Sequence, residues 1–65
     1  MVRKFTTKSG SVYFIDEEKN TMSGGCLPRP MTIAYLSPIM GGCRVYATLA
    51  DPEMGMVRIK TSVVE

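Results

Sequence analysis

Residues 43–65 read CRVYATLADPEMGMVRIKTSVVE, and the residues on the two sides of the 51–55 segment separate by parity. One parity is apolar or small, and it holds Cys43, Val45, Ala47, Leu49, Val57, Ile59, Thr61 and Val63. The other is polar and basic, and it holds Arg44, Tyr46, Thr48, Arg58, Lys60 and Ser62. Because side chains alternate across a strand, the stretch predicts a β-hairpin with one dry face and one basic, tyrosine-bearing face.

The turn of this hairpin is predicted at residues 51–55. Asp51-Pro52 is typical of the start of a type I turn, and Gly55 tolerates a positive φ. A slip of one residue would turn the arginines toward the core, so the sequence strongly specifies the register. The expected pairs on the dry face are Leu49 with Val57, Ala47 with Ile59, Val45 with Thr61, and Cys43 with Val63.

Residues 3–16, RKFTTKSGSVYFID, predict a second hairpin about a Ser9-Gly10 turn. A three-residue loop with Gly10 in the left-handed region would offset the pairing that a two-residue loop gives, and the sequence allows either. A two-residue loop leaves Ile15 on the outer face, where it would need cover. It sets Phe5 opposite Phe14, Thr7 opposite Val12, and Arg3 opposite Asp16.

The middle of the chain predicts two further strands and no helix. Residues 21–23 form a short candidate strand, and residues 31–36 form a longer one that is fairly apolar on both faces. The segment between them, residues 24–30, is too rich in glycine and proline for regular structure. We therefore expect one all-β domain spanning residues 1–65, a small five-stranded barrel or half-open sandwich built from two hairpins.

Size and composition limit the classes of protein to which the chain can belong. Sixty-five residues bury only about 60% of the surface of the unfolded chain, so we expect a homo-oligomer. No apolar run approaches the roughly 20 residues that span a bilayer, which predicts a cytoplasmic protein with no membrane partner. With no histidine and only Cys26 and Cys43, which are expected to stay unbridged, we expect no metal and no cofactor.

Catalysis is the least favoured function. The chain has no histidine base, and Asp16, Glu17 and Glu18 cluster in one polar turn where solvent should keep them ordinary. We therefore expect a protein that is not an enzyme.

The best candidate for a ligand site is the basic face of the last hairpin. Arginine binds phosphate or carboxylate bidentately, and tyrosine stacks on a base or packs in an interface. A plain solvated surface is the alternative interpretation. The candidate ligand-binding residues are Arg44, Tyr46, Arg58 and Lys60, with Arg29, between two prolines, as a secondary contributor.

Two glycine pairs could also take part in anion binding. The amides of Gly24-Gly25 and Gly41-Gly42 could approach a phosphate closely, or these glycines could simply serve tight turns.

The segments FTTKSGSVYFID (5–16), SPIMG (37–41) and TSVVE (61–65) resemble a pattern found in short proteins of bacterial and phage genomes. The resemblance implies a small SH3-like β-barrel. It also implies a phage-type inhibitor that blocks host defence by sequestering a protein surface or a phosphorylated nucleotide signal. The chain departs from the pattern at its compact 26–30 loop, where a longer insert is expected, so no binding residue is carried over there.

Two alternatives to this function stay open. Small barrels often present a basic, aromatic strand face to nucleic acid, which makes a nucleic-acid-binding barrel the first. The second is a structural subunit of a larger assembly. The expected partners are therefore a host protein or an anionic nucleotide, with nucleic acid possible.

Overall fold

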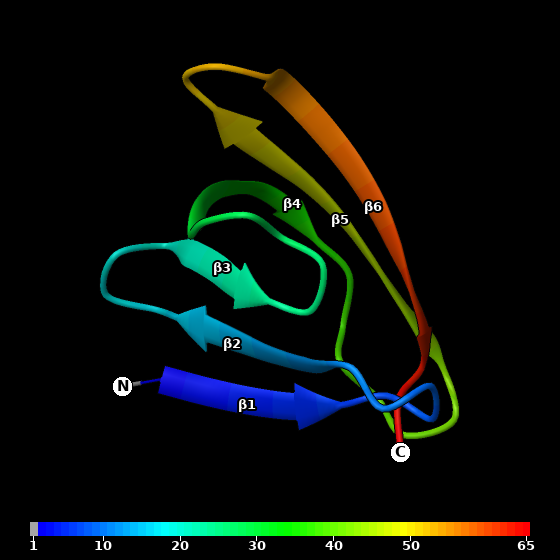
Figure 1. Ribbon diagram of the computed structural model, residues 1–65. Coiled ribbons are helices and arrows are strands. Elements are labelled where there is room, and N and C mark those ends of the chain that lie inside the picture. Colours follow the sequence, from blue (N-terminus) through cyan, green and yellow to red (C-terminus); the bar gives the residue numbers. More distant parts are fainter. Residues whose placement is uncertain (1) are drawn as a thin grey trace.

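The computed structural model describes residues 2–65, which form one antiparallel sheet of six strands in the order β1-β2-β3-β4-β5-β6 (Figure 1). The strands are β1 (Val2–Thr6), β2 (Val12–Asp16), β3 (Thr21–Gly24), β4 (Met31–Leu36), β5 (Arg44–Asp51) and β6 (Gly55–Val63). The predicted all-β class is confirmed, and the short strand expected at 21–23 is present as β3.

The sheet curls but is not a closed barrel, so the predicted five-stranded barrel or sandwich is not confirmed. The edge strands β1 and β6 approach each other at one corner and then diverge (Figure 1). At that corner Thr7 bridges Val64, and the Lys8 amide donates to the Val63 carbonyl at 2.8 Å. Beyond this corner the two strands diverge, and within residues 2–65 no strand pairs with the rest of either edge.

The core lies on the concave face of the curled sheet and draws on both hairpins. Its buried apolar residues are Phe5, Tyr13, Ile15, Met22, Met31, Val45, Ala47, Leu49 and Val64. The first hairpin therefore supplies the apolar surface against which the last hairpin packs.

The first hairpin adopts the offset register rather than the two-residue loop. Phe5 pairs with Tyr13, and their rings stack with centroids 5.1 Å apart. Gly10 takes a φ of 91°, and its amide donates to the Thr7 carbonyl, which closes a turn one residue longer than a two-residue loop. The predicted two-residue pairing is wrong: Ile15 is buried, and Phe14 lies on the outer face with 41% of its surface exposed.

The last hairpin follows the predicted register only up to a β-bulge on β6. Leu49 pairs with Val57 and Ala47 with Ile59 as expected, but Arg44, not Cys43, lies opposite Val63. The bulge falls at Thr61, whose hydroxyl accepts from the Val45 amide at 3.0 Å and donates to the Ser62 carbonyl at 2.8 Å. The expected Cys43–Val63 pair is therefore wrong, and Cys43 is exposed. Val45 still meets Thr61, but through the threonine hydroxyl within the bulge and not as a regular ladder pair.

A second bulge interrupts β4 at Ala34. Ile33 pairs with Leu49, but the next paired residue, Tyr35, lies opposite Thr48. The extra residue moves Tyr35 to the outer face of the sheet, where 56% of its surface is exposed. Tyr35 consequently shares a face with Tyr46 and not with Ile33.

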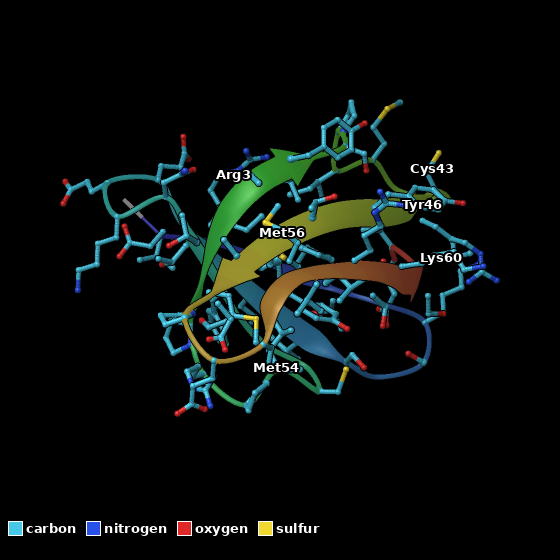
Figure 2. All side chains as sticks on the ribbon, turned by 90° about the horizontal axis from the view of Figure 1, so that it is seen from above. Arg3, Cys43, Tyr46, Met54, Met56 and Lys60 are labelled. Atoms are coloured by element: carbon cyan, nitrogen blue, oxygen red, sulfur yellow. The ribbon has the colours of Figure 1, made fainter. Side chains whose placement is uncertain are left out.

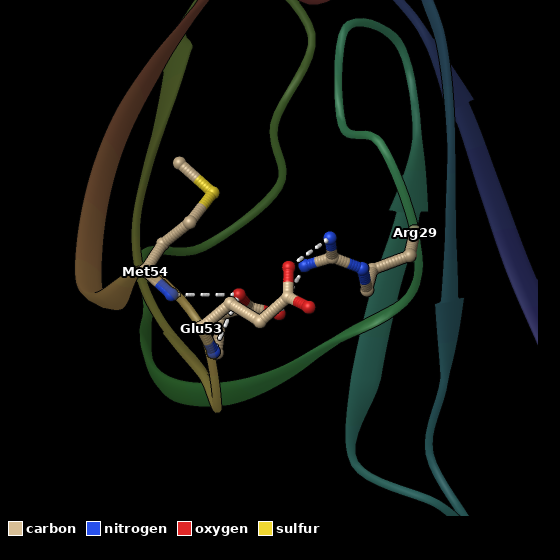
Figure 3. A network of polar contacts seen from close by, with 4 residues as sticks. Arg29, Glu53 and Met54 are labelled. Atoms are coloured by element: carbon tan, nitrogen blue, oxygen red, sulfur yellow. Dashed lines mark hydrogen bonds and ion pairs between the residues drawn. The ribbon is translucent and has the colours of Figure 1, made fainter.

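Arg29 fastens the 25–30 loop to the β5–β6 turn (Figure 3). Its guanidinium donates to the buried Asp51 carboxylate at 2.7 Å and to Glu53 at 2.9 Å. Asp51 also accepts from the amides of Glu53 and Met54, as expected of the first residue of this turn. Arg29 and these two amide bonds hold the pKa of the Asp51 carboxyl below its ordinary value.

The described residues show no membrane-spanning segment of the helical kind. Across residues 2–65 no helix has the length and apolar character that would be needed to cross a bilayer.

Candidate functional site: the outer face of β4–β6

The outer face of the three C-terminal strands gathers two tyrosines and three cations. Adjacent strands set Tyr46 opposite Lys60 and Thr48 opposite both Tyr35 and Arg58. Arg44 lies at the start of β5, beyond Tyr46 on the same parity. We call this surface the basic-aromatic face: Tyr35, Arg44, Tyr46, Thr48, Arg58 and Lys60.

The two tyrosines lie close enough to act on one ligand. Tyr35 is opposite Thr48, and Tyr46 is two residues from Thr48 on the same strand. Diagonal neighbours of this kind are about 7–8 Å apart, within reach of one another for aromatic side chains. Tyr46 has 51% of its surface exposed, and Figure 2 shows it beside Lys60 at one end of the face. Both rings therefore offer accessible surface, and the ring of Tyr46 does so next to the positive charge of Lys60.

The cations of this face are available to an anion. Among residues 2–65 no ion pair joins Arg44, Arg58 or Lys60 to a carboxylate. Arg44 donates to the Thr61 carbonyl at 3.3 Å. An anionic ligand would thus gain interactions with these groups without displacing a carboxylate partner.

Arg29 does not join the basic-aromatic face. The two acids that it binds, Asp51 and Glu53, neutralise its charge, and Asp51 is buried beneath it. The structure therefore brings together four of the five predicted site residues and gives the fifth a role in fastening a loop.

An open hollow adjoins the face at the turn end of the last hairpin. Its volume is about 370 Å³, and it is lined by Thr32, Ala50, Asp51, Pro52, Gly55 and Met56. Thr32, Ala50 and Met56 form the cross-strand row next to Tyr35, Thr48 and Arg58. The short side chains of Thr32 and Ala50 leave room for an apolar group of a ligand. The charged part of that ligand would then contact the cations of the face.

The glycine pairs serve turns rather than an anion cradle. The Gly25 amide donates to the Val12 carbonyl, and the Gly42 amide donates to the Val64 carbonyl, both at 2.9 Å. Gly25 also lies against the buried Tyr13 ring, where a Cβ would collide. Because the Gly25 and Gly42 amides already have partners, neither glycine pair can offer both of its amides to a phosphate.

The two cysteines are single thiols. Cys26 and Cys43 are free and exposed, which agrees with the expectation that they stay unbridged. Over residues 2–65 no three histidine, cysteine or acidic side chains group as metal ligands would. Burial and the nearby Cys26 raise the pKa of the Tyr13 hydroxyl above its ordinary value.

Sequence reasoning missed Tyr35 as a member of the face. Strict alternation along residues 31–36 puts Tyr35 on the parity of Met31 and Ile33, and the bulge at Ala34 reverses that assignment. The only hint was that both faces of residues 31–36 are apolar, which left the exposed side undecided.

Comparison of the chain with protein-family models, curated proteins and solved structures finds no match.

Proposed function

We propose that the chain is a non-enzymatic binding protein that holds a phosphorylated nucleotide on the basic-aromatic face. The observation that supports this most is one surface that holds two exposed tyrosines and three cations, none of which pairs with a carboxylate within residues 2–65. Arg58 and Lys60 would bind phosphate, while Tyr35 and Tyr46 would stack on a base. Thr48, between them, can accept or donate a hydrogen bond.

The biological setting that we propose rests on the resemblance of three segments to phage and bacterial proteins. A small protein that binds a nucleotide signal without turning it over lowers the free concentration of that signal. Such binding would inhibit host defence by sequestering the signal. Alternatively, the same cations would inhibit host defence by binding a surface of a host protein.

Single-stranded nucleic acid is the second candidate ligand. The spacing of Tyr35 and Tyr46 on neighbouring strands favours it, because successive bases stack on separate aromatic rings in sequence-tolerant binding. Such binding weakens with salt in proportion to the number of phosphates neutralised, with a slope of about −0.7 per phosphate on single strands.

Isothermal calorimetry tests the site with three probes: ATP, cyclic di-AMP and a single-stranded oligonucleotide of about eight nucleotides, a length within the usual site sizes. Arg58→Glu/Lys60→Glu should abolish binding. Lys4→Glu/Lys8→Glu is the matched control, because it lowers the net charge equally at exposed positions on the first hairpin. Equal losses in the two variants would assign binding to overall charge and would contradict the site.

The tyrosines distinguish base stacking from phosphate binding alone. Replacing Tyr35 or Tyr46 by serine should cost about 1–3 kcal/mol for each base that is stacked. Unchanged affinity in both variants would mean that the face binds phosphate only. Absence of binding to all three probes would contradict the proposed function.

A further inference from the structure

The outer edge of β6 presents main-chain groups that no other strand of residues 2–65 pairs with. The Tyr46 carbonyl accepts from the Ser37 amide on the β4 side, so Tyr46 does not exchange hydrogen bonds with Lys60 across the β5–β6 ladder. Main-chain groups of an antiparallel strand point alternately to its two sides. The amides and carbonyls of Met56, Arg58 and Lys60 therefore point away from β5 toward an open edge.

This edge is open along most of its length. Within the part of the chain that the structure describes, the first hairpin reaches it only at the far end, where the Lys8 amide donates to the Val63 carbonyl and Thr7 bridges Val64. On the concave side, Val57 and Ile59 are only partly buried, so an added strand would cover more of them. On the convex side, Arg58 and Lys60 stand two residues apart.

We propose that this edge takes up an extended acidic segment of a partner protein as a seventh strand. Its acidic residues, at alternate positions, would lie beside Arg58 and Lys60, and its apolar residues between them would lie beside Val57 and Ile59. Opposite charges on neighbouring strands attract, and main-chain hydrogen bonds to the edge supply affinity.

A second copy of this chain is disfavoured by charge. Pairing of two β6 edges would set Arg58 and Lys60 of one copy beside those of the other, and like charges opposite each other destabilise a sheet. Lys4 lies on the outer parity of β1, the other open edge, so pairing of β6 with β1 meets the same repulsion. Both edges thus favour an acidic occupant.

The probe is a capped peptide of about eight residues, the length of a typical strand, in which glutamate alternates with valine or threonine. In the free protein the amides of Val57 and Ile59 should exchange slowly, and those of Met56, Arg58 and Lys60 quickly. With the peptide bound, the exchange of these three amides should slow by about tenfold or more. Binding that leaves their exchange unchanged would overturn the proposal.

Two modified sets of peptides test the mode of binding on the unaltered protein. One peptide is N-methylated at its odd-numbered residues and a second at its even-numbered residues. One of the two should lose binding and the other should keep it, because only alternate amides face β6. Equal effects of the two methylation patterns would overturn strand addition. A peptide with glutamine in place of glutamate should bind about tenfold more weakly, and equal affinity would overturn the acidic preference.

The same experiments separate this proposal from the proposed nucleotide function. Tyr35→Ser/Tyr46→Ser should leave peptide binding unchanged, because the edge does not use these rings, and loss of peptide binding in that variant would overturn the assignment to the edge. Protection of Met56, Arg58 and Lys60 that rises with protein concentration in the absence of peptide would identify a second copy as the occupant and overturn the proposed partner.

Discussion

Replacement of Gly25 by alanine should destabilise the protein more than alanine at any glycine that stands in open space. Gly25 has a φ of 55°, and an added Cβ would lie 2.7 Å from the Tyr13 hydroxyl oxygen and closer still to the ring. Tyr13 is buried and stacked on Phe5, so it cannot move away freely. Left-handed strain costs an alanine about 1 kcal/mol and overpacking about 1–3 kcal/mol, for a total of about 2–4 kcal/mol.

The matched control is Gly55→Ala. Gly55 has a φ of 74°, and a Cβ there would meet nothing within 4 Å, so this variant carries the backbone strain alone. Thermal unfolding followed by circular dichroism should show a Tm about 4–8 °C lower for Gly55→Ala, and about 10–30 °C lower for Gly25→Ala. The additional loss of Tm in Gly25→Ala, compared with Gly55→Ala, should shrink when Tyr13→Leu is combined with Gly25→Ala. Equal losses in the two glycine variants would refute the packing of Tyr13 against the loop.

Three further perturbations test the core, the turn and the bulge. Leu49→Ala removes a fully buried side chain and should lower the free energy of unfolding by about 3–5 kcal/mol in urea titrations. The lowered pKa of Asp51 means that its ionised form stabilises the fold at neutral pH. This contribution is lost as the pH falls through a value below 3.8. The Asp51→Asn variant should therefore lose less stability on acidification than the unaltered chain. Thr61→Val leaves the Val45 amide without its acceptor and should cost about 1–3 kcal/mol by the same titrations.

Hydrophobic parity predicted the strands and most of the last hairpin, because a wrong register there would bury charge. It placed Leu49 opposite Val57 and Ala47 opposite Ile59, as the structure does. It failed beyond Lys60. There the Val45 amide donates to the Thr61 hydroxyl, and β6 carries one extra residue in a bulge. A parity rule cannot foresee a bulge, because a bulge changes the parity on which the rule depends.

The first hairpin shows a different limit. Both candidate loops keep Phe5 on the core side. The two-residue loop would place Phe14 beside it, and the three-residue loop places Tyr13 and Ile15 there. Turn geometry decided this, since Gly10 adopts the left-handed conformation that the longer loop requires. The composition of residues 12–16, apolar on both parities, left the sequence without a preference.

The candidate site was predicted in part. Arg44, Tyr46, Arg58 and Lys60 share the face that their parity indicated, since even the β6 bulge lies beyond Lys60. Arg29 had no visible partner in the sequence, because Asp51 and Glu53 lie more than twenty residues away and meet it only through the fold. Long-range polar pairs of this kind leave no local pattern.

The most direct test of the basic-aromatic face is a ¹H–¹⁵N NMR titration of the labelled protein with cyclic di-AMP and with ATP. The largest shifts should fall on Tyr35, Tyr46, Arg58 and Lys60, while the first hairpin and the Gly24-Gly25 loop should stay unchanged. Shifts centred on those unchanged regions, or no shifts with either nucleotide, would contradict nucleotide binding at this face.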